Sequence, residues 1–242
     1  MKLERVLSFV LLAFVLVSCA GQKGDDGAVG PAGPAEPGLY YVKIFQQGVY
    51  NSNYSGQVQA SLTNQYSGAT YTSQTMDIAI GKDSVYRHRA IIKFDISSLP
   101  SSRVIVEKAE MTIHTNNVFE GNGAENVGFY RLNAPWTVNN AGYMYSSFDS
   151  VGVAWPQYGA WETGSNTVTV NTGYYNLPPN TKITVELEPE LIQDWMFNSQ
   201  NNYGLIIKSE DENTTNYSEI YPSLAADTSK RPMLKIWYYT TE

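Results

Sequence analysis

The chain has 242 residues, of which 43% are hydrophobic and 16% charged, enough for one large or two small globular domains. A formal net charge of −7 argues against a broad basic surface for nucleic acid, and 13% aromatic residues exclude general disorder. One Cys and two His exclude a disulfide framework and a multi-Cys metal site, and leave little for a His-based metal site or a catalytic triad.

The first eighteen residues have the pattern of an export signal. Lys2 and Arg5 precede an apolar run at 6–17 that only Ser8 interrupts. This run is too short to span a bilayer, which takes about 20 residues, and fits the apolar part of a secretory signal. It ends in Leu16-Val17-Ser18-Cys19, which resembles the lipobox of bacterial lipoproteins, where the Cys is lipidated. We expect an exported protein anchored to the membrane by lipid on Cys19, in the bacterial cell envelope, at the outer membrane or cell surface. An ordinary signal peptide that contains a Cys is the alternative.

Residues 19–38 have a different composition, rich in Gly and Pro. Gly falls at 24, 27, 30 and 33, a period of three that resembles a collagen-like stub. This number of triplets is too small to hold a triple helix. We therefore expect an extended tether, with trimerisation as the alternative. About 20 residues at roughly 3.1 Å each reach up to ~60 Å.

Residues 39–242 read mainly as short strands separated by turns. The apolar alternation places Ala90, Ile92 and Phe94 on one strand face, and Pro189 is expected to open a short helix whose apolar stripe packs in the core. Many strands with one helix predict an all-β fold, an antiparallel β-sandwich of jelly-roll-like topology. The expected strands are 39–46, 75–81, 89–95, 104–115, 127–132, 167–170, 181–187, 203–208 and 233–239.

Five segments in order carry a family resemblance. Residues 89–100 (RAIIKFDISSLP) resemble the signature of DNRLRE domains, which are related to archaeal disaggregatase repeats and carbohydrate-binding module family 96. The resemblance implies a β-sandwich in which Asp95 and Ser97 satisfy turn N–H groups, and a module found beside enzymes or in surface proteins. The other matching segments are 109–113 (AEMTI), 127–132 (VGFYRL) with Trp136, 191–195 (LIQDW) with 202–206 (NYGLI), and 231–238 (RPMLKIWY).

Basic residues on one strand face are the first candidate ligand site. Arg87, Arg89 and Lys93 project from the non-core face of the strand at 87–95, and Arg131 and Lys208 lie in neighbouring strands. Arg matches a sugar carboxylate through its planar fork. The alternative is ion pairing within the sheet, with carboxylates such as Glu110, Glu186 or Asp95.

Aromatic residues in the long segment 136–166 are the second candidate, because flat rings stack on pyranose faces. Burial of the Trp residues at the edge of the sandwich is the alternative. The segment carries Trp136, Tyr143, Tyr145, Trp155, Tyr158 and Trp161.

The acidic run Glu210-Asp211-Glu212 is a candidate Ca²⁺ site, with a solvated turn as the alternative because it lacks alternating ligand spacing. We expect no catalytic residues, no other cofactor and no nucleic acid partner. The sequence thus predicts a lipid-anchored surface protein with a non-catalytic carbohydrate-binding module for an acidic polysaccharide, such as a uronic-acid polymer. A structural or adhesive surface protein without a sugar ligand is the alternative, and its protein partners are not specified by the sequence.

Overall fold

A computed structural model describes residues 39–49, 54–64, 76–137, 141, 145–147, 153–154 and 175–241. The chain divides into two compact units, Met1–Glu36 and Pro37–Glu242, and all described residues belong to the second. The export signal, Cys19 and the whole tether at 19–38 lie outside the described residues, as does the expected strand at 167–170. No helix in the described part is long and apolar enough to cross a membrane.

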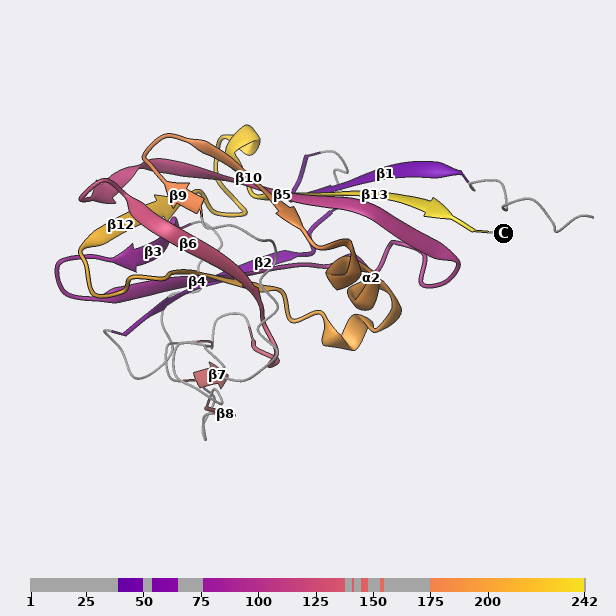
Figure 1. Cartoon of the computed structure of the whole chain (residues 1–242), viewed down its shortest axis with the longest axis horizontal. Coiled ribbons are helices and arrows are strands. Elements are labelled where there is room, and N and C mark those ends of the chain that lie inside the picture. The colour runs from indigo at the N-terminus through magenta and orange to yellow at the C-terminus, as the bar shows by residue number, and fades with distance from the viewer. Residues whose placement is uncertain are drawn as a thin grey trace, which may run out of the picture. The chain divides into compact units, whose positions relative to one another are not determined.

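Strands dominate the described residues, together with one α-helix and two short 3₁₀ turns (Figure 1). The strands are β1 (Tyr40–Gln46), β2 (Gln57–Thr63), β3 (Ile78–Lys82), β4 (Arg87–Phe94), β5 (Val104–Glu120), β6 (Ala124–Arg131), β7 (Tyr145–Ser147), β8 (Val153–Ala154), β9 (Tyr175–Leu177), β10 (Lys182–Leu187), β11 (Leu205–Ser209), β12 (Asn216–Ile220) and β13 (Met233–Thr240). The helix is α2 (Pro189–Phe197), and the 3₁₀ turns are η2 (Ser199–Asn201) and η3 (Thr228–Lys230).

Eleven of the described strands form one antiparallel sheet that curls over itself. Nine of them follow the order β1-β13-β5-β12-β3-β4-β11-β6-β9, while β10 pairs with β5 and β2 pairs with β4. β5 joins the two layers, because residues 104–114 pair with β13 and β10 while its end pairs with β12. We call β1, β13, β10 and that part of β5 sheet A. Sheet B comprises β2, β4, β11, β6, β9, β3 and β12. The separate β7–β8 pair completes the described strands. The all-β, sandwich-like fold, with one helix in the described part, is as predicted.

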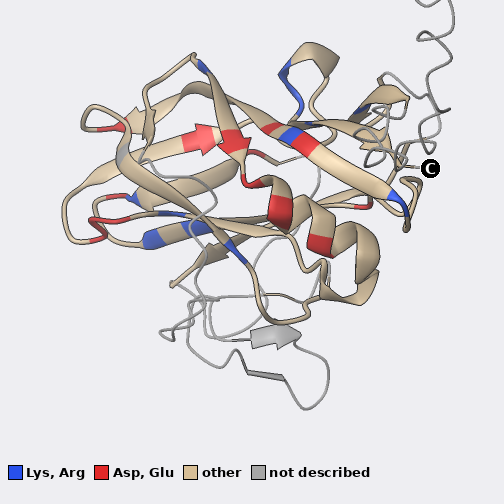
Figure 2. Cartoon of the chain, turned by 45° about the vertical axis from the view of Figure 1, so that its right-hand side comes forward, with Lys and Arg blue, Asp and Glu red and all other residues tan. Residues whose placement is uncertain are grey.

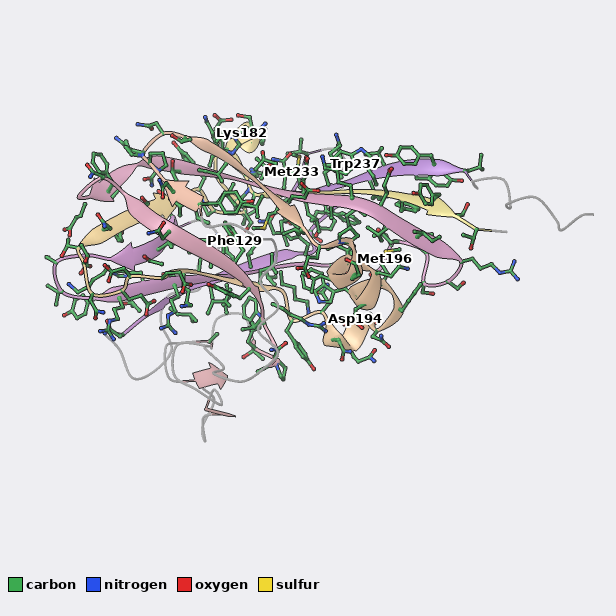
Figure 3. All side chains as sticks on the ribbon, in the orientation of Figure 1. Phe129, Lys182, Asp194, Met196, Met233 and Trp237 are labelled. Atoms are coloured by element: carbon green, nitrogen blue, oxygen red, sulfur yellow. The ribbon has the colours of Figure 1, made fainter. Side chains whose placement is uncertain are left out.

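The main hydrophobic core lies between the two sheets. Ala90, Ile92 and Phe94 of β4 belong to it, which confirms the predicted core face of this strand. Figure 3 shows Phe129 of β6 between the layers, with α2 at one end of the sandwich. Pro189 occupies the first turn of α2, and the predicted apolar stripe of this helix, which includes Trp195, is buried in the core.

A second hydrophobic cluster covers part of the opposite face of sheet B. Ile91 of β4, Leu62 of β2, Ile206 of β11 and Tyr130 of β6 are buried there, with Trp136 packed against them. The face of β4 that carries Arg89 and Lys93 is therefore partly covered and is not a flat open surface.

Candidate functional site

Arg89, the strongest predicted ligand residue, is engaged within the protein. Its Nε donates to Oε1 of Glu212 at 2.7 Å and its Nη2 to Oε2 at 2.6 Å. The two side chains are only 8% and 13% exposed. This two-point pair is the arrangement we expected for a ligand carboxylate. The ion-pair alternative therefore holds for Arg89, with Glu212 as partner in place of Glu110, Glu186 or Asp95.

The neighbouring basic residues are also tied to the loop that follows β11. Arg87 donates to the carbonyl of Glu212 at 3.0 Å and to Oδ1 of Asn213 at 3.1 Å. Lys208 is buried and lies 3.2 Å from Glu210, which also accepts a hydrogen bond from Tyr130. Figure 2 shows basic and acidic segments interspersed over the described ribbon. At this end of sheet B, the ion pairs of Arg89 with Glu212 and of Lys208 with Glu210 offset the basic charges.

The acidic run 210–212 sends its carboxylates to different partners. Glu210 contacts Lys208, and Glu212 contacts Arg89. Hydrogen bonds from Thr214 and from the Asn213 N–H lower the pKa of the exposed Asp211 below its ordinary value. The three carboxylates do not converge, and the described residues contain no group of three His, Cys, Asp or Glu side chains placed to hold a metal.

Two other predicted residues also have partners within the fold. Arg131 pairs with Asp194 of α2. The indole of Trp136 donates from Nε1 to the carbonyl of Tyr203 at 2.7 Å and packs on the second cluster, as the burial alternative expects. The predicted ligand residues Trp155 and Trp161 lie outside the described residues.

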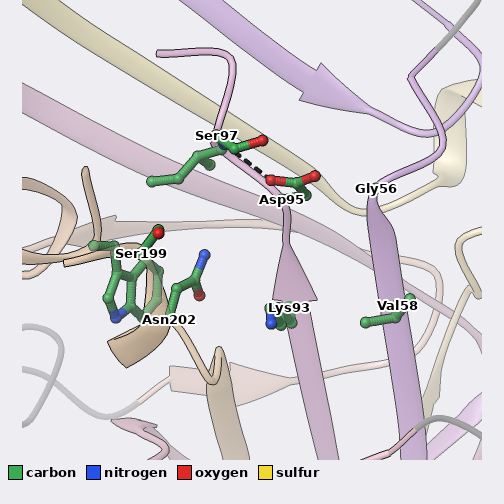
Figure 4. Close-up of a pocket in the computed structure, with 9 residues that line it drawn as sticks. Gly56, Val58, Lys93, Asp95, Ser97, Ser199 and Asn202 are labelled. Atoms are coloured by element: carbon green, nitrogen blue, oxygen red, sulfur yellow. Dashed lines mark hydrogen bonds between the residues drawn. The ribbon is translucent and has the colours of Figure 1, made fainter. Parts of the chain in front are cut away.

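An open pocket of about 470 Å³ lies where β4 ends, β2 begins and the chain leaves α2. This volume is within the roughly 300–1,000 Å³ of small-molecule sites. Lys93 and Asp95 line it from the β4 side, and Trp195, Ser199 and Asn202 from the helix side. Figure 4 shows Asn202 and Lys93 opposite each other, with Val58 of β2 beyond Lys93. Among the predicted ligand residues that the structure describes, Lys93 is thus the one that lines this pocket.

Two buried polar atoms of this lining lack a partner among the described residues. The Nε1 of Trp195 and the Oδ1 of Asn202 make no hydrogen bond, although the two residues are only 2% and 5% exposed. The Nδ2 of Asn202 donates to the carbonyl of Phe94 at 2.9 Å, which fixes the amide in the wall. A buried polar atom without a hydrogen bond lowers the stability of the fold by about 1–3 kcal/mol. A donor and an acceptor that both lack partners beside one pocket therefore require an explanation.

The two charged residues of the pocket lining, Lys93 and Asp95, differ in their contacts. No carboxylate of the described residues lies within ion-pair distance of Lys93. Asp95 accepts a hydrogen bond from the Ser97 N–H at 2.9 Å, as the resemblance implies for a turn-forming Asp. The backbone of Asp95 in turn donates to Gly56, where a Cβ would lie 2.6 Å from the Asp95 Cβ. Lys93 is therefore a cation near the end of β4 with no ion-pair partner among the described residues.

Segments far apart in the sequence build this pocket. Lys93 and Asp95 come from 89–100, Trp195 from 191–195 and Asn202 from 202–206, and these ranges belong to two of the five segments quoted for the DNRLRE resemblance. Sequence reasoning assigned Trp195 to the core and did not select Asn202 as a ligand residue. Their juxtaposition with Lys93 follows from the fold, since no local pattern links them.

No family model matches the chain, and no curated protein is similar enough to count as a match. The family resemblance therefore rests on the five short segments, and the function must be inferred from the chemistry of the pocket.

Proposed function

We propose that this protein is a lipid-anchored surface protein whose β-sandwich binds an acidic polysaccharide without cleaving it. The ligand site in this proposal is the pocket at the end of β4. One observation supports this site most directly. The buried Trp195 donor and the buried Asn202 acceptor have no hydrogen-bond partner among the described residues, and both line the pocket with Lys93, which has no ion-pair partner among those residues.

Each lining group matches one group of an acidic sugar. The ammonium of Lys93 attracts the carboxylate as a point charge with three donors. The Trp195 Nε1–H donates to a sugar oxygen, and Oδ1 of Asn202 accepts from a hydroxyl. The Ser199 hydroxyl, which both donates and accepts, lies in the same lining. A sugar that reaches these atoms gains hydrogen bonds for groups that the fold leaves unpaired.

Binding requires a small movement of the pocket lining, because both open atoms are buried. Lys93 has a flexible four-carbon stem and is the lining side chain best suited to move. We expect affinity in the micromolar to millimolar range, about −8 to −4 kcal/mol, because one charge and a few hydrogen bonds act at an open site. Added salt should weaken it, since a pair between Lys93 and a ligand carboxylate is screened at a solvated surface.

A matched pair of charge-removing variants tests the site. Isothermal titration of the domain with a polyuronate at low salt should show at least tenfold weaker binding for Lys93→Gln than for the unchanged protein. Lys182→Gln on β10 makes the same change in net charge at an exposed position remote from the pocket lining, and should bind normally.

Equal weakening by both variants would mean nonspecific charge attraction and would contradict the site. Absence of binding to any acidic polymer at low salt would refute the proposed ligand class and would favour the structural or adhesive alternative.

A further inference from the structure

Exposed apolar side chains gather at one end of sheet A. Leu39 is 71% exposed, Tyr40 53%, Val42 46% and Ile105 49%. The strand register places Tyr40 opposite Tyr239, and Tyr239 opposite Ile105, so residues of three neighbouring strands meet in one row. We call Leu39, Tyr40, Val42, Ile105 and Tyr239 the end patch. Trp237 pairs with Val42 and therefore lies on the same face of sheet A as this row; Figure 3 labels its place on the sheet.

The end patch lies where the chain enters the described fold. Leu39 directly follows the Gly/Pro segment 19–38 and leads into β1, and the C-terminus lies at the same end (Figure 1). A segment of about 20 residues reaches at most ~60 Å, so its length keeps the domain near an anchor at Cys19. A patch at the base of such a linker spends much of its time near whatever surface holds the other end.

We propose that the end patch rests on the lipid bilayer to which the protein is anchored. This inference depends on the proposed anchoring through Cys19. Tyr side chains suit the membrane interface, because the ring is apolar while the hydroxyl stays hydrated. A short linker also raises the effective concentration of the patch at the membrane to about millimolar, so that weak apolar contact is enough to hold it there.

The same patch fits a second copy of the chain less well. β1 ends the described sheet, and pairing of two such edges would extend it. Lys43 lies in the middle of β1, and a charged side chain on an edge strand opposes that kind of pairing. A bilayer needs no strand pairing and accepts a Lys that extends to the headgroups.

Site-specific fluorescence tests the inference without relying on lipidation. Both hydrophobic clusters lie within the described part of unit 37–242, and this unit contains no native Cys. The unit, with an N-terminal histidine tag, is bound to phosphatidylcholine vesicles that contain a chelating lipid. An environment-sensitive dye is attached to Ile105→Cys or, as the control, to Val85→Cys. Val85 is 62% exposed in the β3–β4 turn, at the opposite end of the domain in Figure 1.

The inference requires a blue shift and quenching by lipid-borne quenchers for the dye at 105 but not for the dye at 85. Adding Tyr40→Ser and Val42→Ser should reduce the shift at 105 by at least half. An equal response at both positions, or none at 105, would overturn the inference. A shift at 105 that grows with protein concentration without vesicles would also overturn it, in favour of self-association. Because the chelating lipid supplies the anchor, failure here is distinct from failure of lipidation at Cys19 or of polysaccharide binding.

Discussion

Replacing Arg89 shows whether this residue serves as an internal ion-pair partner or as a ligand residue. The Arg89→Ala variant removes both hydrogen bonds to Glu212, at 2.7 and 2.6 Å, and leaves a carboxylate that is only 13% exposed. Loss of one partner of a buried pair typically costs about 3–5 kcal/mol, because the other charge remains buried and uncompensated. For a domain of this size, each kcal/mol lowers Tm by about 2–4 °C, so we expect Tm to fall by roughly 6–20 °C.

Urea unfolding followed by Trp fluorescence measures this loss. Arg87→Ala is the control, because Arg87 contacts the same loop at partly exposed positions, and it should cost less than about 1 kcal/mol. The double variant Arg89→Met with Glu212→Leu should recover most of the stability, since apolar residues often replace a buried ion pair without loss. If Arg89→Ala left stability nearly unchanged and abolished polysaccharide binding, the internal role of the ion pair would be excluded and Arg89 would be a ligand residue.

Three further changes have expected outcomes. Gly204→Ala should lower the free energy of unfolding by about 1–3 kcal/mol, measured by thermal unfolding. The reason is that Gly204 has a φ of +90° and that a Cβ would lie 2.3 Å from the Ile92 carbonyl oxygen. An unchanged Tm would contradict this close approach. Burial and two nearby lysines lower the pKa of His114, so the fold favours the neutral ring, and stability should fall as pH drops below the unfolded value of about 6.5. His114→Asn should remove that part of the pH dependence, and an identical pH profile would show that another group causes it. Cys19→Ala should leave an unlipidated protein that no longer partitions into detergent, whereas continued partitioning would exclude lipid anchoring through Cys19.

Strands with regular apolar alternation were predictable from sequence, whereas polar core positions were not. Ala109 and Met111 alternate with polar residues in β5, and both are fully buried as expected. β2 escaped prediction because Gln57 and Gln59 occupy its inward positions, where the alternation rule expects apolar residues. β9 and β12 are short and Tyr- and Asn-containing, and were not predicted either.

The candidate site was predictable only in part, for a related reason. Strand periodicity correctly grouped Arg89 and Lys93 on one face of β4. It could not show that Glu212, 123 residues later, occupies the fork of Arg89. Helical spacing correctly placed Trp195 in the core, but the unpaired state of its Nε1 depends on what surrounds the indole in three dimensions. Which predicted residues remain available to a ligand depends on side chains that are distant in the sequence and that only the fold brings next to them.

The most direct test of the pocket is the indole N–H signal of Trp195 during a polyuronate titration. The chain has five Trp, so a ¹H–¹⁵N spectrum of the domain gives at most five indole signals, and Trp195→Phe assigns the one in question. We expect this signal to move saturably with the oligosaccharide and to stay in place in the Lys93→Gln variant at the same concentrations. A stationary Trp195 signal while another indole signal shifts with bound sugar would contradict the pocket as the binding site.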